Sequence, residues 1–569
     1  MAAENAQFVS DLRTLDRPPT PRFPGTPKNG LRNQSPMNWG PKPSSLEDIK
    51  KQLTEDQGQV NINKDHTIVL YKSGSHGAET DAQNMVVSTD ARIKNSFPPG
   101  PPGLPVIGNL HQFGTANNIH IYLWKLSKKY GPLMHMKLGP VPVLIISSAK
   151  LAKEVFKTQD LAFCSRPRLL GQQKLSYNGL DIAFSPYNDY WKEVRKIVAV
   201  HLFSLKKNQS FSPIRADEMS RMVTKISGFA SCNKVVNLSE MVMTLGITLI
   251  CRIAFGKRYD EHGFEMRRFG ELLHEAQASM ATFFVSDYFP AFAWVDKLTG
   301  LINQVDTTCK NLDSFYQELI DEHLNRDRAK KGVEEDDDIL DILIQLKEHK
   351  SSSIELSWDN IKALLMNIFI GATDTSAASI IWTMTAIIKA PKIMEKVQAE
   401  IRNLIGKKGK VEEDDLPKLL YLKAVINETF RLYSPVPLLI PRETVEKCIL
   451  EGYEIQPKTV VYVNAWAVAR DPEYWENPNE FLPERFLNNN IDIKGQDFGV
   501  VPFGSGRRVC PGMFMGLANV ELTVANLLYS FDWKLPLGMQ VEDVNTDVSP
   551  GITMHKKNAL LLVPKKYVV

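Results

Sequence analysis

The sequence is most informative at Phe503-Gly504-Ser505-Gly506-Arg507-Arg508-Val509-Cys510-Pro511-Gly512. Its glycines allow a tight turn that holds one cysteine sulfur in place. Pro511 stands where a helix would begin, and helical spacing follows from Met513 to Ser530. Cys510 is therefore predicted at a helix N-terminus, where backbone N–H groups and the helix dipole stabilise a thiolate. Such a thiolate suits metal ligation or nucleophilic attack; the alternative is a buried structural cysteine.

The spacing F-x-x-G-x-R-x-C-x-G is met in full by Phe503, Gly506, Arg508, Cys510 and Gly512. This loop resembles the haem-thiolate loop of the cytochrome P450 family. The resemblance implies haem b as the cofactor, bound by these residues, with Cys510 as the axial ligand of the iron. It also implies a mainly α fold with small β-sheets (α+β), in which a long central helix lies over the haem and the cysteine loop lies beneath it.

The clearest predicted helix begins after Ser357, a good N-cap, and runs to the residue before Pro391. About 32 residues at 1.5 Å each give a helix of roughly 48 Å, long enough to cross a domain. It is apolar on nearly every face, which predicts a buried central helix. It nevertheless carries Asp374, a carboxylate that is costly to bury without a partner. Strands are predicted at Val141–Ile146, Val460–Val463 and near Ala559–Val563.

Residues 371–376 of this helix resemble the family's oxygen-binding motif (A/G)-G-x-(D/E)-T-(T/S). The resemblance implies that Asp374 and Thr375 relay protons to bound oxygen. We expect the Thr375 hydroxyl to bond back to the carbonyl of Gly371 and loosen the helix locally. A threonine satisfied only by its own backbone is compatible with this reading. Ala372 stands where the family usually has glycine, and its methyl group should narrow the oxygen site without abolishing the chemistry.

A second motif is the E-x-x-R pair of Glu428 and Arg431, three residues apart on one helix face. Taken alone, such a pair is usually an ordinary surface ion pair. Arg485, in Pro483-Glu484-Arg485-Phe486, resembles the third member of the family's Glu-Arg-Arg triad. The resemblance implies a structural role behind the haem.

Four residues resemble the family's partners of the haem propionates: Trp191, Arg195, Arg442 and Arg508. Trp191 and Arg195 match W-x-x-x-R, in a helix that we expect to open at Ser185-Pro186. Buried propionates need charge-assisted hydrogen bonds, and arginine supplies them in a fork.

Apolar positions near these motifs are candidates for the substrate pocket, and each is equally consistent with plain core. They predict a hydrophobic substrate. The candidates are Leu180, Phe184, Ile370, Ala372, Val436, Leu438, Leu439 and Ile552.

The resemblance implies a monooxygenase that inserts one oxygen atom of O2 into its substrate. No electron-donor domain is recognisable, so electrons are expected from NADPH through a partner, NADPH-cytochrome P450 reductase. The proline hinge after Phe97, the PERF motif and the segment 287–296 resemble the plant A-type group, which implies a small hydrophobic plant metabolite or xenobiotic as substrate. Two alternatives stay open: a P450-fold isomerase or dehydratase that needs no O2, and an inactive haem-binding or interaction protein.

Composition limits the partners. The chain has 569 residues, 43% of them hydrophobic, with a net charge of +3. These figures exclude a disordered or collagen-like chain, and they give no electrostatic footprint for nucleic acid. The six cysteines show no C-x-x-C pairing, which favours a reducing compartment. A basic group near the cysteine loop is a candidate surface for an acidic reductase: Lys192, Lys196, Lys206, Lys207 and Arg507.

Residues 1–96 and 97–569 differ in character. The first segment is polar and proline-rich, and we predict a mostly disordered extension. The second is predicted to be one haem domain. Family members normally carry a membrane anchor before the proline hinge, whereas the chain shows no apolar run there. We favour the hypothesis that residues 1–96 are a gene-model artefact in place of the anchor. The resemblance then implies a location on the cytosolic face of the endoplasmic reticulum membrane. The alternative is a soluble cytoplasmic variant in which residues 1–96 are a real extension.

Overall fold

The structure is a computed structural model, and it describes residues 59–62, 68–71, 97–113, 118–326, 337–349, 354–487, 489 and 491–568. The chain divides into two compact units. The smaller unit comprises residues 17–97 and 449–454. Its described part includes an antiparallel hairpin of β1 (Gln59–Ile62) and β2 (Ile68–Tyr71). The rest of the predicted extension lies outside the described residues.

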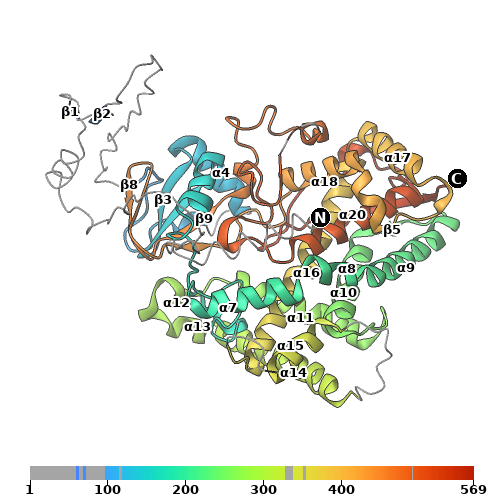
Figure 1. Ribbon diagram of the computed structural model, residues 1–569, viewed down its shortest axis with the longest axis horizontal. Coiled ribbons are helices and arrows are strands. Elements are labelled where there is room, and N and C mark those ends of the chain that lie inside the picture. Colours follow the sequence, from blue (N-terminus) through green and yellow to red (C-terminus); the bar gives the residue numbers. More distant parts are fainter. Residues whose placement is uncertain are drawn as a thin grey trace, which may run out of the picture. The chain divides into compact units, whose positions relative to one another are not determined.

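The larger unit, which contains residues 98–448 and 455–569, is mainly helical (Figure 1). Two π-helical turns, Glu154–Thr158 and Val198–Leu202, continue α5 and α7. The helices are α3 (Leu110–Phe113), α4 (Ile119–Tyr130), α5 (Ala149–Lys153), α6 (Leu170–Leu175), α7 (Asp189–Ile197), α8 (Leu205–Ser210), α9 (Ser212–Ser231), α10 (Leu238–Phe255), α11 (Phe264–Ala281), α12 (Val285–Tyr288), α13 (Trp294–Leu298), α14 (Leu301–Asn325), α15 (Ile339–Glu348), α16 (Trp358–Ile388), α17 (Pro391–Ile405), α18 (Leu420–Leu432), α19 (Ala465–Val468) and α20 (Met513–Ser530).

Two small sheets complete this unit. One has the order β3-β4-β9-β6, with β4 and β9 parallel and the other pairs antiparallel; its strands are β3 (Leu133–Leu138), β4 (Val141–Ile146), β9 (Val460–Val463) and β6 (Arg442–Glu443). The other has the order β10-β11-β5, from β10 (Phe531–Lys534), β11 (Leu561–Lys566) and β5 (Val236–Asn237). The strands β7 (Cys448–Leu450) and β8 (Tyr453–Ile455) pair in a separate two-stranded sheet, whose residues 449–454 belong to the smaller unit. The predictions of β4 and β9 are confirmed to the residue.

The predicted central helix is confirmed as α16. Ser357 caps it: its hydroxyl accepts from the Asn360 N–H, while the Asn360 side chain accepts from the Ser357 N–H. Most of its residues are buried, from Asn360 to Ile388. Both α10 and α16 are long and apolar enough to span a membrane, although α10 contains Glu240 and Arg252 and α16 contains Asp374. Because most of each helix is buried within the protein, both pack as core helices here.

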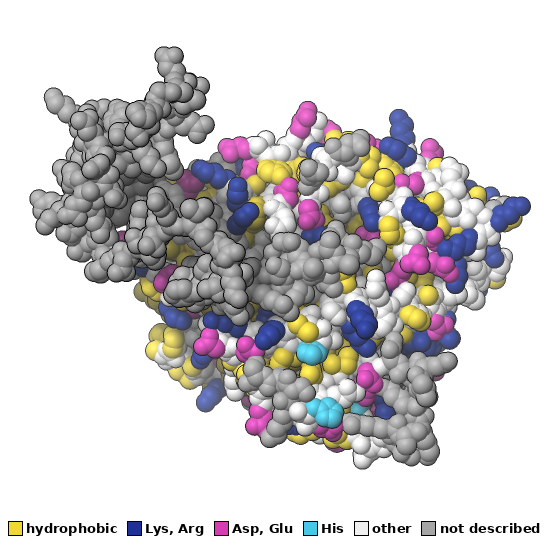
Figure 2. Space-filling model, in the orientation of Figure 1, with side chains coloured by type: hydrophobic (Ala, Val, Ile, Leu, Met, Phe, Trp, Pro, Cys, Tyr) yellow, Lys and Arg dark blue, Asp and Glu magenta, His cyan; other side chains and the backbone are white. Residues whose placement is uncertain are grey.

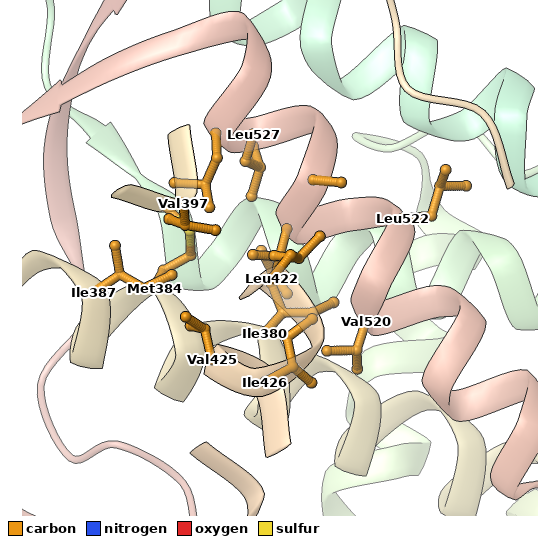
Figure 3. Packing of buried hydrophobic residues seen from close by; sticks show 14 of the residues in the cluster. Ile380, Met384, Ile387, Val397, Leu422, Val425, Ile426, Val520, Leu522 and Leu527 are labelled. Carbon is orange, nitrogen blue, oxygen red and sulfur yellow. The ribbon is translucent and has the colours of Figure 1, made fainter. Parts of the chain in front are cut away.

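The largest part of the core forms where α16, α17, α18 and α20 meet (Figure 3). Ile380 and Met384 of α16 face Val425 of α18 and Leu527 of α20, and all four are almost completely buried. Burying a side chain of this size stabilises the fold by about 1.5–3 kcal/mol. This core fixes α16 against α20, the helix that follows Cys510.

Candidate functional site

The cysteine loop is a tight turn closed by its own backbone. The Cys510 N–H donates to the Phe503 carbonyl at 3.0 Å, and the Val509 N–H donates to the Gly506 carbonyl at 3.0 Å. Gly506 has a φ of +67°, and a Cβ there would lie 2.5 Å from both Asp160 Oδ1 and the Phe156 carbonyl oxygen. Only glycine fits this position. The turn therefore places Cys510 immediately before α20, as predicted.

Cys510 lines a cavity of about 1090 Å³. Burial raises the pKa of its thiol, and the N–H of Gly512 and the charge of Arg195 lower it by less. The backbone N–H therefore acts in the predicted direction, but burial outweighs it in the free thiol. A thiolate at this position needs a bound metal cation, which deprotonates a coordinating thiol.

Four arginines line the same cavity, and each is at most 9% exposed: Arg166, Arg195, Arg442 and Arg508. Most of their partners are backbone carbonyls. Arg508 donates to Cys164 and Ser185, and Arg195 donates to Val509. Arg442 also donates to Asp160 Oδ1 at 2.9 Å. Arg166 donates to Ala183, Ile440 and Pro441, and the sequence motifs gave no signal for it.

This arginine cluster has more positive charge than its described partners offset. Burial lowers the pKa of Arg195 to about 10 and that of Arg508 to about 9, which shows that the charged forms are poorly solvated. The Nε of Arg195 is buried and has no hydrogen-bond partner among the described residues. Buried cations and one unpartnered N–H donor at an apolar cavity fit a planar cofactor with two carboxylates, as haem b has.

Trp191 does not itself line the cavity. Its helix, α7, begins at Asp189 with Asn188 as the N-cap, later than the expected Ser185-Pro186 opening. The Trp191 indole N–H donates to the Ile182 carbonyl at 2.9 Å, and the Arg508 guanidinium lies 4.0 Å from its ring centroid. Trp191 thus supports Arg508, and the structure brings both together with Arg195.

The central helix α16 contributes Ile370, Ala372 and Thr375 to the cavity wall. The Thr375 hydroxyl donates to the Gly371 carbonyl at 2.7 Å, as predicted. Asp374 is not among the cavity-lining residues and is only 2% exposed. Its Oδ1 lies 2.7 Å from the Nε2 of His555. Burial raises the pKa of Asp374. The hydrogen bond and charge of His555 lower that pKa, and so do the side chains of Thr553 and Gln277. Together these interactions outweigh burial, so the pKa of Asp374 lies below its usual value. The sequence motifs gave no signal for His555.

The Glu-Arg-Arg triad assembles as the sequence predicts. Arg431 donates to Glu428 Oε2 at 2.7 Å and Oε1 at 2.8 Å, and Arg485 donates to Oε1 at 3.1 Å. Glu428 and Arg431 are completely buried, so the alternative interpretation as an ordinary surface ion pair is wrong.

Seven of the eight substrate candidates line the cavity; Leu180 does not. Its carbonyl accepts from the Tyr190 hydroxyl, and its N–H donates to Ser176, which keeps it in the turn after α6. The next residues enter the cavity because Asn367 of α16 accepts from the Ile182 and Ala183 N–H groups. The cavity also includes polar residues that the sequence motifs missed: Gln172, Thr282 and Asn367.

The basic group near the loop is mostly paired. Arg507 donates to Asp160 Oδ2 at 3.0 Å and is not a free surface charge. Lys192 pairs with Asp189 at 2.9 Å, and Lys207 donates to the Asp337 carbonyl at 2.6 Å. Lys206 is exposed.

Comparison with known sequences gives consistent results. Residues 98–563 match the family model described as Cytochrome P450. The chain is 51% identical over 479 residues to the 6,7,8-trihydroxycoumarin synthase of Pastinaca sativa, covering 83% of this chain and 94% of that protein. It is 50% identical to the 5-OH-xanthotoxin synthase of Ammi majus, covering 83% and 93%, and 48% identical to Cytochrome P450 71B36 of Arabidopsis thaliana, covering 83% and 93%.

Comparison with solved structures supports the fold. A zebra fish cytochrome P450 determined with progesterone superposes with a TM-score of 0.67 at 24% identity, covering 79% of this chain and 99% of that one.

Proposed function

Because this chain belongs to the cytochrome P450 family, we propose that Cys510 binds the haem iron and that the cavity above it holds an oxygenated aromatic plant metabolite. The chain is a haem-thiolate monooxygenase whose cofactors are haem b, O2 and electrons from NADPH delivered by a reductase. One observation carries the assignment of residues: Cys510, the four buried arginines and Thr375 line a single cavity.

When bound, haem b supplies the activation of O2 and the insertion of one oxygen atom into the substrate. Cys510 holds the iron through its sulfur, and the loop hydrogen bonds fix the position of that sulfur. Arg195, Arg442 and Arg508 bind the two carboxylates, because their guanidinium groups are buried around the same cavity.

Thr375 and Asp374 deliver protons to the cavity. The Thr375 hydroxyl lies in the cavity wall and is held by the Gly371 carbonyl, so it can orient water beside the reacting oxygen. Asp374, the preceding residue of α16, is the buried acid that replenishes those protons. The methyl group of Ala372 lines the same wall and limits the room for additional water.

The substrate class follows from the lining and from the relatives. The cavity wall is mainly apolar, with Phe184 and Ile552 among its residues, and Gln172, Thr282 and Asn367 add a few polar groups. Relatives named 6,7,8-trihydroxycoumarin synthase and 5-OH-xanthotoxin synthase are each about half identical to this chain over 479 aligned residues. A flat aromatic lactone with few hydrogen-bonding groups fits such a wall.

The test begins with the haem. The purified protein should show the reduced, CO-bound Soret band of thiolate ligation, and Cys510→Ser should lose it. Cys448→Ser, at a partly buried cysteine outside the cavity, is the matched control and should keep the band. A Cys510→Ser protein that kept the band would contradict the ligand assignment.

Turnover tests the reaction and the substrate class. With NADPH-cytochrome P450 reductase, NADPH and O2, the wild type should hydroxylate xanthotoxin or a dihydroxycoumarin. Thr375→Val should divert electrons to hydrogen peroxide and lower product per NADPH roughly tenfold or more, since general acid–base groups contribute that much. Thr375→Ser keeps the hydroxyl and should retain most of the coupling. Product at the wild-type ratio from Thr375→Val would contradict the role of this hydroxyl.

Members of this family are usually associated with the endoplasmic reticulum membrane, and an apolar surface supports that location for this chain. Hydrophobic side chains cluster over the α12–α13 segment, at the lower left of Figure 2. Phe292, Trp294 and Leu298 are each more than half exposed. The patch continues through Phe289, whose ring meets that of Phe292 edge to face, with the ring centroids 6.4 Å apart. Phe289 also covers Gly139, whose N–H donates to the Ile107 carbonyl. Exposed Trp and Phe are typical of membrane interfaces.

Binding to phosphatidylcholine vesicles tests this surface in the full chain. The double variant Trp294→Gln, Leu298→Gln should float with vesicles roughly tenfold less, since each buried methylene contributes about 0.8 kcal/mol. Leu537→Gln, at a fully exposed leucine outside the patch, should bind like the wild type. Equal binding of the double variant would exclude the patch as the membrane surface.

A further inference from the structure

His555 and Asp374 form an ion pair that connects the buried wall of the cavity to solvent. The His555 Nε2 lies 2.7 Å from Asp374 Oδ1. The two side chains differ sharply in exposure, at 28% for His555 and 3% for Asp374. The imidazole therefore reaches water while the carboxyl does not.

The backbone around His555 is held firmly against α16. The Trp382 indole of α16 donates to the Met554 carbonyl at 2.6 Å, and the Met554 N–H donates to Pro435 at 2.8 Å. The Ser549 N–H donates to the His555 carbonyl at 2.9 Å. These bonds hold the backbone at His555 in place, so that the imidazole lies beside Asp374.

The same pair adjoins the reaction cavity. Thr375 follows Asp374 in α16, and Ile552 and Thr553 precede His555; all three line the cavity. The second oxygen of Asp374, Oδ2, is buried and has no hydrogen-bond partner among the described residues. Gln277 of α11 and Thr553 also lower the pKa of this carboxyl, but neither side chain can carry a charge. His555 is thus the ionisable group that the described structure pairs with Asp374.

We propose that His555 is the residue through which Asp374 takes up protons from solvent. This inference rests on the proposed role of Asp374 and Thr375. In the protonated state, His555 Nε2–H gives its proton to Asp374 Oδ1, leaving a neutral imidazole and a neutral carboxyl. The carboxyl releases its proton toward Thr375 and becomes a carboxylate again. The imidazole, which still carries Nδ1–H, rotates to expose Nε2 to solvent, takes up a proton there and returns to Asp374. His555 is a positioning residue, since it acts on the cavity only through Asp374.

Turnover of xanthotoxin by the holoenzyme with reductase tests the proposal. His555→Gln should lower kcat roughly tenfold with KM changed less than about twofold, raise the solvent isotope effect on kcat, and increase hydrogen peroxide per NADPH. Lys557→Gln, which removes an exposed cation two residues away, should behave like the wild type. A His555→Gln enzyme with unchanged kcat, isotope effect and coupling would overturn the proposal.

A second variant separates proton uptake from holding the carboxylate. His555→Lys keeps a cation opposite Asp374, but lysine, with a pKa of about 10.4 in water, holds its proton too tightly to deliver it near neutral pH. It should restore the Tm lost in His555→Gln without restoring kcat. Full recovery of kcat in His555→Lys would show that a fixed cation suffices, and it would overturn proton uptake through the imidazole.

Thermal unfolding supplies a measurement independent of turnover. The loss of Tm in the double variant His555→Gln, Asp374→Asn should be smaller than the sum of the two single losses, because the two residues are coupled. Additive losses would show that the pair does not form in solution, and the proposal would fail. An inactive Asp374→Asn beside a fully active His555→Gln would overturn the uptake route alone and leave the role of Asp374 standing.

Discussion

Arg431 binds both carboxylate oxygens of Glu428, at 2.7 and 2.8 Å, and neither side chain has any exposed surface. The same guanidinium donates to the carbonyls of Ala469, Pro478 and Glu480. One buried pair therefore ties α18 to the segment between α19 and the PERF turn. Removing either partner leaves an uncompensated buried charge.

We expect Glu428→Gln to lower the free energy of unfolding by about 3–5 kcal/mol, because it leaves Arg431 buried without its carboxylate. Urea unfolding followed by circular dichroism measures this. The matched control is Lys396→Gln, which breaks an exposed pair with Glu484 at 2.8 Å and should cost less than about 1 kcal/mol. Equal losses for the two variants would contradict the buried role of Glu428.

Arg508→Leu should bind less haem. Its guanidinium is buried beside the cavity, so a leucine removes a charge-assisted partner of a carboxylate while leaving the wall packed. We expect haem per polypeptide, from the pyridine haemochromogen assay, to fall to roughly half or less, as a lost charged hydrogen bond contributes about 1.5–3 kcal/mol. Arg267→Leu, at an exposed arginine of α11, should bind haem normally. Full haem content in Arg508→Leu would remove Arg508 from the haem contacts.

Asp287 makes stability depend on pH. It lines the cavity, accepts from the Leu170 N–H at 2.8 Å, and has its pKa raised to about 6 by burial. The folded protein therefore binds the proton more tightly than the unfolded chain, so Asp287 lowers stability as pH rises from about 4 to 6. Asp287→Asn should be more stable than the wild type at pH 7.5 by roughly 1–2 kcal/mol, allowing for partial exposure. The difference should vanish near pH 4; a constant difference across pH would contradict this origin.

Substitutions at Ile552 and at Leu180 should affect substrate binding differently, because Ile552 lines the cavity and Leu180 does not. Ile552→Ala should raise the KM for xanthotoxin by roughly threefold to tenfold, because each methylene removed from a contact costs about 0.8 kcal/mol. Leu180→Ala should leave KM within about twofold, since Leu180 lies in the turn after α6 and not in the wall. Steady-state kinetics decide between them, and the reverse ranking would contradict the cavity assignment.

Local sequence predicts those features of the structure that depend only on residues close together in the chain. The Ser357 cap and the apolar run behind it define α16; the helix begins where predicted and ends at Ile388, two residues earlier than expected. The Thr375 bond to Gly371 joins residues four apart, so spacing alone predicts it. Gly506 is required because its turn leaves no room for a Cβ, and the motif contains that requirement.

Other features join segments far apart in the chain, and spacing carries no signal for them. His555 is paired with Asp374 across 181 positions of the sequence (555 − 374). Arg166 reaches the cavity from a loop that resembles no motif, and Leu180 is turned away from it by a hydrogen bond to Tyr190. Burial raises the pKa of the Cys510 thiol by more than the Gly512 N–H and Arg195 lower it, and local sequence does not specify that burial.

The sequence by itself determined the family, the haem loop, the central helix and the acid–alcohol pair, because each depends on short spacings that backbone geometry fixes. Only the tertiary structure decided which side chains share one cavity, which charges are buried together and which residue connects Asp374 to water. Those properties depend on how separate helices and loops pack, since burial and pairing are set by neighbours that no local pattern specifies.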